Sequence, residues 1–148
     1  SKNKPISIRN PNSTRPWQHV LEPLSGYLCL AKALYDYPNM GVFDSSFNFG
    51  PNLESNRKVL DLANFSLNFW EGQIKIEKKS DIHEAGLLNL NIDKAYHKLG
   101  WCPIWTFEKT IEKTIIWYKK VIDEKCDPYE ACFSDLSDFN EDLLANNS

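Results

Sequence analysis

The stretch IRNPNSTRPWQHVLEPLSGYL, residues 8–28, decides how the first part of this chain folds. It continues an alternation of apolar and polar residues over 4–9, which predicts a strand. Residues 10–14 have the composition of a turn. Pro16 disfavours helix in the residue before it, so the segment around it is expected to be extended. Pro23 suits the first turn of a helix that follows. One apolar face of that helix is formed by Leu24, Tyr27, Leu28, Ala31 and Leu34.

Beyond this stretch, strand and helix patterns alternate without repeats. Further strands are expected at 46–49, 73–78 and 87–91. Helices are expected to begin at the caps Ser55, Asn91 and Thr106 and, later, at Pro128 and Asp135. The first of these helices is expected to close at Gly72 and the second at Gly100. The alternation predicts the α/β class, with few short strands and covering helices whose apolar faces need a sheet or another domain behind them.

The composition is that of a folded protein, and its charge is unevenly distributed. Of 148 residues, 42% are hydrophobic and 25% are charged, and the formal net charge is −3. Residues 123–148 contain eight acidic residues and one basic residue, so an acidic helical tail is expected there. Residues 1–122 contain sixteen basic and twelve acidic residues, which suits a small anionic ligand. Nucleic acid is not expected as a partner, because phosphate contacts need clustered Lys and Arg.

Cysteine spacing and hydropathy exclude several other classes. The four cysteines form no C-x-x-C pair, and none lies near a histidine at zinc-finger spacing, so no metal site is expected. No signal peptide is evident, and no apolar run approaches the ~18 residues that a membrane span needs. These features lead us to expect a cytoplasmic protein with reduced thiols and no membrane partner.

The motifs of the common nucleotide-dependent enzymes are absent from the sequence. The six glycines, at 26, 41, 50, 72, 86 and 100, are too far apart for G-x-G-x-x-G. No tyrosine is followed four residues later by a lysine, the pair that activates a phenol in short-chain dehydrogenases. No catalytic residue and no cofactor site are therefore expected within this chain.

Three segments nevertheless resemble a known family. Residues 8–28, quoted above, resemble the corresponding block of the CDP-glucose 4,6-dehydratases, a branch of the extended short-chain dehydrogenase/reductase superfamily. The segment LGWCPIWTFEKTIEKTIIWYK, residues 99–119, resembles the closing part of nucleotide-sugar epimerases and dehydratases in general. FNFGP, residues 47–51, resembles the strand that ends at their sugar-nucleotide pocket.

The resemblance implies that residues 1–122 are the C-terminal, nucleotide-sugar-binding portion of such an enzyme, whose NAD-binding Rossmann portion precedes it. The whole enzyme uses NAD to convert CDP-D-glucose to CDP-4-keto-6-deoxy-D-glucose, a step of deoxysugar biosynthesis for lipopolysaccharide O-antigen. This chain would supply contacts to the sugar nucleotide and be inactive alone.

The resemblance also suggests site residues. In the superfamily, the Arg of an R-D-[YF]-x-H-V motif contacts the diphosphate, and the matching segment here is RPWQHV, which begins at Arg15. A guanidinium makes paired bonds to phosphate oxygens, although an inter-strand ion pair is the alternative. His83 is at the position of a second diphosphate ligand or is an ordinary loop histidine. Trp17 and His19 line the pocket or serve core packing and strand hydrogen bonding. Asn48 binds substrate or is a structural amide.

Two other functions stay open. The chain could be a non-catalytic sugar-nucleotide binding or interaction module, or part of an epimerase or dehydratase that uses another nucleotide. If the chain is part of a dehydratase, its helices lose buried apolar surface when the Rossmann strands are absent. Each ~400 Å² of newly exposed apolar surface costs roughly 10 kcal/mol of stability. Self-association into a homo-oligomer is therefore expected.

Overall fold

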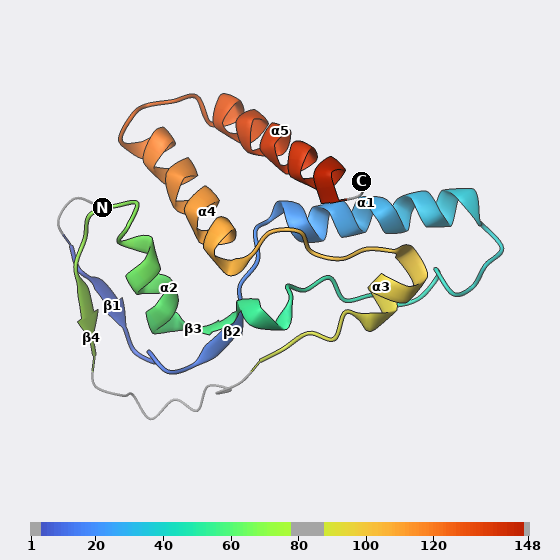
Figure 1. The fold of residues 1–148 in the computed structure, drawn as a ribbon, viewed down its shortest axis with the longest axis horizontal. Coiled ribbons are helices and arrows are strands. Elements are labelled where there is room, and N and C mark those ends of the chain that lie inside the picture. Colours follow the sequence, from blue (N-terminus) through green and yellow to red (C-terminus); the bar gives the residue numbers. More distant parts are fainter. Residues whose placement is uncertain (1–3, 78–87, 147–148) are drawn as a thin grey trace.

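The computed structural model describes residues 4–77 and 88–146 and shows an elongated molecule of helices and short strands (Figure 1). The strands are β1 (Ile6–Ile8), β2 (Thr14–Pro16), β3 (Asn56–Lys58) and β4 (Ile74–Ile76). The helices are α1 (Leu21–Asp36), α2 (Val59–Ser66), α3 (Asp93–Leu99), α4 (Phe107–Ile122) and α5 (Pro128–Asn146), with a short 3-10 helix, η1, at Leu53–Ser55. This mixture confirms the α/β class with few short strands and covering helices.

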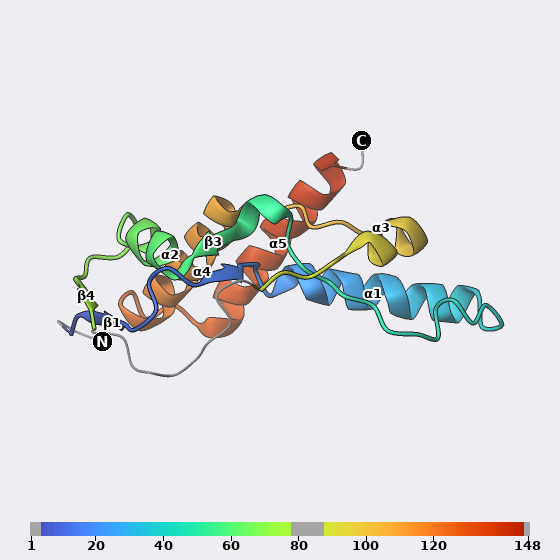
Figure 2. The same cartoon turned by 90° about the horizontal axis from the view of Figure 1, so that it is seen from below.

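The strands form two separate pairs within the described residues. β1 and β4 are parallel, with Ile6 opposite Ile74, and β2 and β3 are antiparallel, with Arg15 opposite Arg57. The β1–β4 pair and α2 lie at one end of the molecule, and α1 and α3 extend toward the other (Figures 1 and 2). α4 and α5 pack against each other as an antiparallel pair between these ends.

A buried carboxylate connects α1 to the loop that precedes α4. Glu22, in the first turn of α1, is 1% exposed. Its Oε1 accepts hydrogen bonds from the backbone N of Ile104 at 3.1 Å and of Trp105 at 2.7 Å. Burial raises the pKa of Glu22 from 4.5 to about 6, and the two backbone N–H groups act in the opposite direction. The carboxylate thus satisfies two backbone N–H groups of the loop between α3 and α4.

One core cluster lies between α1 and α3. Phe49, Ala95 and Trp101 are buried together, and the Phe49 ring lies edge-on to Trp101 with centroids 5.0 Å apart. Phe49 can approach α1 this closely because residue 26 is glycine: a Cβ there would lie 2.2 Å from the Phe49 ring. Gly100 ends α3 with a φ of 65°, as its position in the sequence predicts.

A second cluster joins α4 and α5. The Trp105 ring lies edge-on to Phe139 of α5, with centroids 5.0 Å apart, and its Nε1 donates to Asp142 at 2.7 Å. Lys113 of α4 pairs with Asp138 and lies 3.8 Å from Asp135. The segment predicted as an acidic helical tail is therefore helical and packed through one face. Its separation from residues 1–122 as a distinct unit stays a prediction.

Several sequence predictions were wrong. Residues 46–49 form no strand, because no described strand pairs with them. Their burial still alternates as in a strand with one buried face: Phe49 is buried, and Ser46 and Asn48 are exposed. Ser55 lies in η1 and caps no helix, and α2 ends at Ser66 rather than at Gly72. The described part of the predicted strand at 87–91, residues 88–91, is not a strand. The two predicted C-terminal helices are one continuous helix, α5.

The apolar face predicted for α1 exists, but the described residues leave most of it exposed. Leu24 is 45% exposed, Tyr27 58% and Leu28 73%. By contrast, Thr106 caps α4 as predicted, accepting from the Lys109 backbone N at 3.3 Å. The cap at Thr106 was thus predicted correctly from the sequence, whereas the surface that would cover α1 is not provided by the described residues.

The Glu22 interaction leads to a first prediction. Replacing Glu22 with Ala leaves the N–H groups of Ile104 and Trp105 buried and unpaired, which should lower the free energy of unfolding by about 3 kcal/mol. Glu22→Gln, which keeps an acceptor oxygen, should lose less, and Glu141→Ala on the exposed surface of α5 should stay within about 0.5 kcal/mol of the original chain. Urea unfolding measures all three, and equal effects of E22A and E141A would contradict this role.

Candidate functional site

The β2–β3 ribbon positions Arg15. Arg15 is half-buried in β2, and its Nη1 donates to the carbonyl oxygen of Thr14 at 2.8 Å. The ribbon register places Arg57 of β3 directly opposite. Arg57 is exposed, and the sequence reasoning did not identify it, because strand register is not readable from residue spacing along one strand.

Trp17 extends the same ribbon. Its backbone N donates to Ser55 O at 3.2 Å, and its Nε1 donates to Arg57 O at 3.0 Å. Both of its N–H donors therefore attach the end of β2 to the segment formed by η1 and β3. These contacts fit the alternative of strand hydrogen bonding, and a role of Trp17 in substrate binding stays a prediction.

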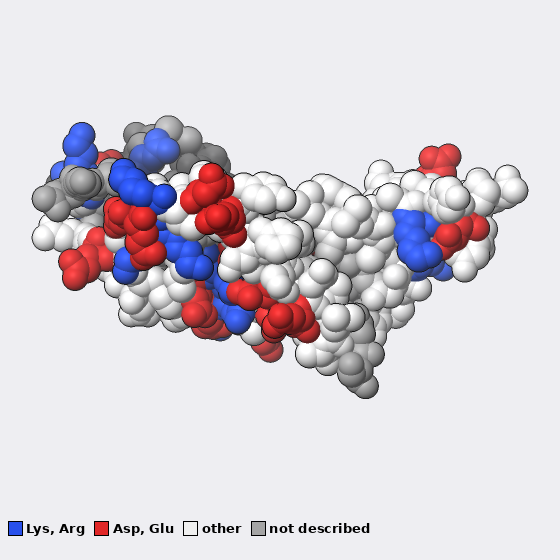
Figure 3. Space-filling model, turned by 90° about the horizontal axis from the view of Figure 1, so that it is seen from above, with Lys and Arg blue, Asp and Glu red and all other residues white. Residues whose placement is uncertain are grey.

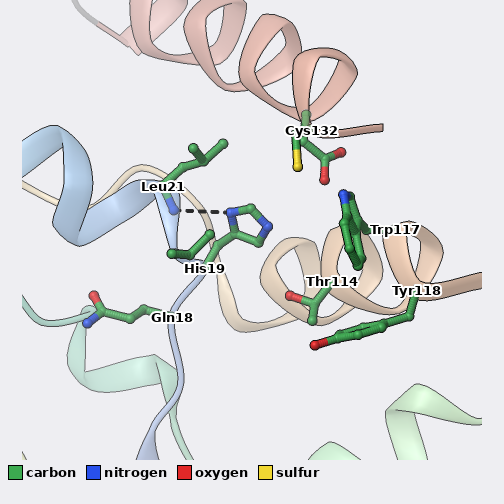
Figure 4. Close-up of a pocket in the computed structure, with 9 residues that line it drawn as sticks. Gln18, His19, Leu21, Thr114, Trp117, Tyr118 and Cys132 are labelled. Atoms are coloured by element: carbon green, nitrogen blue, oxygen red, sulfur yellow. Dashed lines mark hydrogen bonds between the residues drawn. The ribbon is translucent and has the colours of Figure 1, made fainter. Parts of the chain in front are cut away.

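His19 lies at the junction between β2 and α1. It is 7% exposed, its ring lies 4.9 Å from that of Trp105 in an edge arrangement, and its Nδ1 accepts from the Leu21 backbone N at 3.4 Å. Burial, followed by the charge of Lys113, lowers the pKa of His19 from 6.5 to about 4. The ring is therefore neutral at pH 7 with its proton on Nε2, and the edge away from Leu21 faces the side chains of α4 (Figure 4).

His19 also lines a cavity of about 430 Å³. The cavity lies between the start of α1, the C-terminal half of α4 and the first turns of α5 (Figure 4). Its walls are formed by Gln18, His19, Val20, Leu21, Thr114, Trp117, Tyr118, Cys132 and Asp135. Burial raises the pKa of Asp135, and the charge of Lys113 opposes this shift. The cavity has the size of a small-molecule site, but Arg15 and Trp17 are not among its walls.

Asn48 lies on a different segment. Its Nδ2 donates to Asn91 O at 3.2 Å. Lys94 of α3 reinforces the same attachment by donating to the carbonyl oxygen of Ser46 at 2.8 Å. Asn48 thus acts as a structural amide between this segment and the start of α3, and substrate binding by it stays a prediction.

The last sequence-predicted site residue, His83, lies outside the described residues. The structure therefore brings Arg15 and Trp17 together on the ribbon and places His19 in the adjoining cavity.

The described ranges contain no cluster of three or more His, Cys, Asp or Glu side chains arranged to hold a metal ion. Within the same ranges, no helix is both long and apolar enough to cross a membrane. Figure 3 shows Lys and Arg mixed with Asp and Glu at two ends of one face, separated by a wide uncharged stretch. That face carries no continuous basic surface of the kind that binds nucleic acid.

The buried neutral His19 leads to a second prediction. Because its pKa is lower in the folded chain, the unfolded chain binds the extra proton between pH 6.5 and about 4. This contribution to stability is present above pH 6.5 and is lost as the pH falls toward 4, by about 3 kcal/mol in total.

His19→Gln should therefore reduce the loss of stability between pH 7 and pH 4.5, measured by urea unfolding at both values. His97→Gln removes an exposed histidine on α3 and should leave the original pH dependence in place. Glu22 titrates in both variants and cancels in the comparison. An unchanged pH dependence in H19Q would contradict the buried neutral state.

Comparisons with known proteins point to one group of enzymes. No protein-family model matches the chain. The chain is 38% identical over 119 residues to the CDP-glucose 4,6-dehydratase of Salmonella typhimurium, a match that covers 79% of this chain and 33% of that protein. Its fold matches a crystal structure of dTDP-glucose 4,6-dehydratase from Bacillus anthracis in complex with NAD, with a TM-score of 0.58 and 22% identity. That match covers 80% of this chain and 35% of the other.

The chain thus spans about a third of the length of the curated relative it matches. The sequence match confirms the resemblance of the chain to the CDP-glucose 4,6-dehydratases, and the structural match shows the fold. The chain is therefore similar in sequence to part of a CDP-glucose 4,6-dehydratase and similar in fold to part of a dTDP-glucose 4,6-dehydratase.

Proposed function

We propose that this chain is the sugar-nucleotide-binding part of a CDP-glucose 4,6-dehydratase. The observation that carries the proposal is the 38% identity to the Salmonella enzyme over 79% of the chain. The whole enzyme would convert CDP-D-glucose to CDP-4-keto-6-deoxy-D-glucose in the cytoplasm, for deoxysugar biosynthesis. Arg15 is the residue in this chain that would bind the diphosphate, because it is held on a ribbon and retains its charge at neutral pH.

The residues that the structure describes do not form the usual binding site for NAD. The cofactor's pyrophosphate is usually held by a glycine-rich turn between a parallel strand and a helix. In the described residues the parallel pair is β1–β4, and β1 is followed by a turn and β2 rather than by such a helix. We therefore expect hydride transfer to belong to another part of the whole enzyme. The role of this chain is to bind and orient the substrate.

Binding to the isolated chain tests this proposal. CDP-glucose should bind, as measured by calorimetry, and Arg15→Gln should weaken it by roughly 10- to 150-fold, since a charge-assisted interaction is worth about 1.5–3 kcal/mol. Arg9→Gln removes an exposed charge next to β1 and should change the affinity less than about twofold. Incubation of the chain with CDP-glucose and NAD should give no keto product.

The outcomes separate the remaining functions. Turnover by the isolated chain would contradict the assignment of catalysis to another part. Tighter binding of UDP-glucose than of CDP-glucose would favour an epimerase or dehydratase that uses a different nucleotide. Equal losses in R9Q and R15Q would show that the ribbon is not the binding site.

The exposed face of α1 leads to a further prediction. Because Leu24, Tyr27 and Leu28 are all exposed, the isolated chain should self-associate in sedimentation experiments. Leu24→Ser combined with Leu28→Ser should shift it toward monomer. Lys32→Ser, on an exposed position of the same helix, should not. A monodisperse monomer of the unmodified chain would contradict the prediction.

A further inference from the structure

The β2–β3 ribbon places two guanidinium groups on the same face. Arg15 and Arg57 are directly opposite each other in the antiparallel register. Side chains at such positions project from the same side of the ribbon, with Cβ atoms roughly 4.5–5.5 Å apart. Two arginine side chains on one face can both bind a ligand that carries two negative charges, because a guanidinium makes paired hydrogen bonds to phosphate oxygens.

Two contacts restrain the exposed side chain of Arg57. Its Nε donates to Glu54 O at 2.8 Å, and its guanidinium carbon lies 6.0 Å from the centre of the Phe107 ring. Its own carbonyl oxygen accepts from Trp17 Nε1 at 3.0 Å, so the backbone at this point is held as well. These contacts already restrict the rotamers of Arg57, so binding a ligand costs less conformational entropy than it would for an unrestrained arginine.

The rest of the Arg57 guanidinium is available. Arg57 forms no ion pair with any described residue, and neither of its Nη groups donates to one. A guanidinium held through Nε keeps its outer N–H groups for phosphate oxygens, which accept paired hydrogen bonds. If Arg57 has only a structural role, these outer N–H groups donate to water instead.

The surroundings of Arg57 also suit a sugar nucleotide. It borders an open hollow of about 370 Å³ between β3, α2 and the start of α4. The polar groups in this hollow are the amides of Asn64 and Asn68 and the carboxylates of Asp61 and Glu108. Amides and carboxylates suit hydroxyl groups, whereas the carboxylates repel phosphate. The anion is therefore expected above the ribbon, with a hydroxyl-bearing group of the ligand toward the hollow.

We infer that Arg57 is a second diphosphate-binding residue, which acts with Arg15 as a two-guanidinium clamp on the β2–β3 ribbon. This inference rests on the proposed function, because it assigns a further residue to the same site. It also provides the second phosphate ligand that the sequence expected at His83.

The test measures the affinity of the chain for CDP, inorganic pyrophosphate and cytidine by calorimetry. Arg57→Gln should weaken CDP and pyrophosphate about tenfold or more and leave cytidine unchanged, because cytidine has no phosphate. Arg57→Lys, which keeps the charge but not the fork, should give an intermediate loss. Lys58→Gln is the matched control: it removes the same charge one residue later, where the side chain projects from the opposite face, and it should change CDP affinity less than about twofold.

Each outcome decides a separate point. If R15Q weakens CDP and R57Q does not, the clamp is wrong and the proposed function stands. If K58Q and R57Q lose equally, the effect is general charge and the clamp is again wrong. Failure of the unmodified chain to bind CDP overturns both proposals. If R57Q does not fold, as judged by circular dichroism, the R57K result decides, and R57K affinity equal to that of the original chain overturns the clamp.

Discussion

The structure depends on the buried carboxylate of Glu22. It satisfies the backbone of the loop at 104–105 from a helix more than 80 residues earlier in the chain. The same loop connects the two core clusters. On one side Trp101 donates to Ser25 of α1, and on the other Trp105 packs on Phe139 of α5. The position of α1 relative to α4 is therefore set by electrostatics at one point as well as by apolar packing.

The same junction determines how the RPWQHV segment is used. Arg15 and Trp17 alternate onto the ribbon face, where Arg57 meets them, while His19 turns into the cavity beside α4. Since α1 begins only two residues after His19, the Glu22 attachment also restrains the end of β2. A short stretch of sequence thus supplies both a candidate anion site and a packing residue. Arg15 can therefore affect binding at the ribbon without affecting the core, whereas His19 affects the stability of the core.

Some local features could be predicted from the sequence, whereas the long-range ones could not. The cap at Thr106 and the stop at Gly100 depend on neighbouring residues and were correct. The strand at 46–49 was wrong because a strand needs a partner, and sequence pattern cannot show whether one is present. Arg15 was identified through its motif. Arg57 was missed, because its significance comes from a register between segments 42 residues apart. The role of Glu22 was not predicted, because its partners, the backbone N–H groups of Ile104 and Trp105, are remote in sequence.

The contact between Gly26 and Phe49 has a consequence for how α1 tolerates change. A side chain at position 26 would displace the ring that also touches Trp101, so even the smallest replacement disturbs the packing of α3. Two residues along, Leu28 faces open surface and has room for almost any side chain. In a library that samples every residue along this helix, position 26 would therefore tolerate no substitution. Position 28 would tolerate most of them, unless a partner surface covers it.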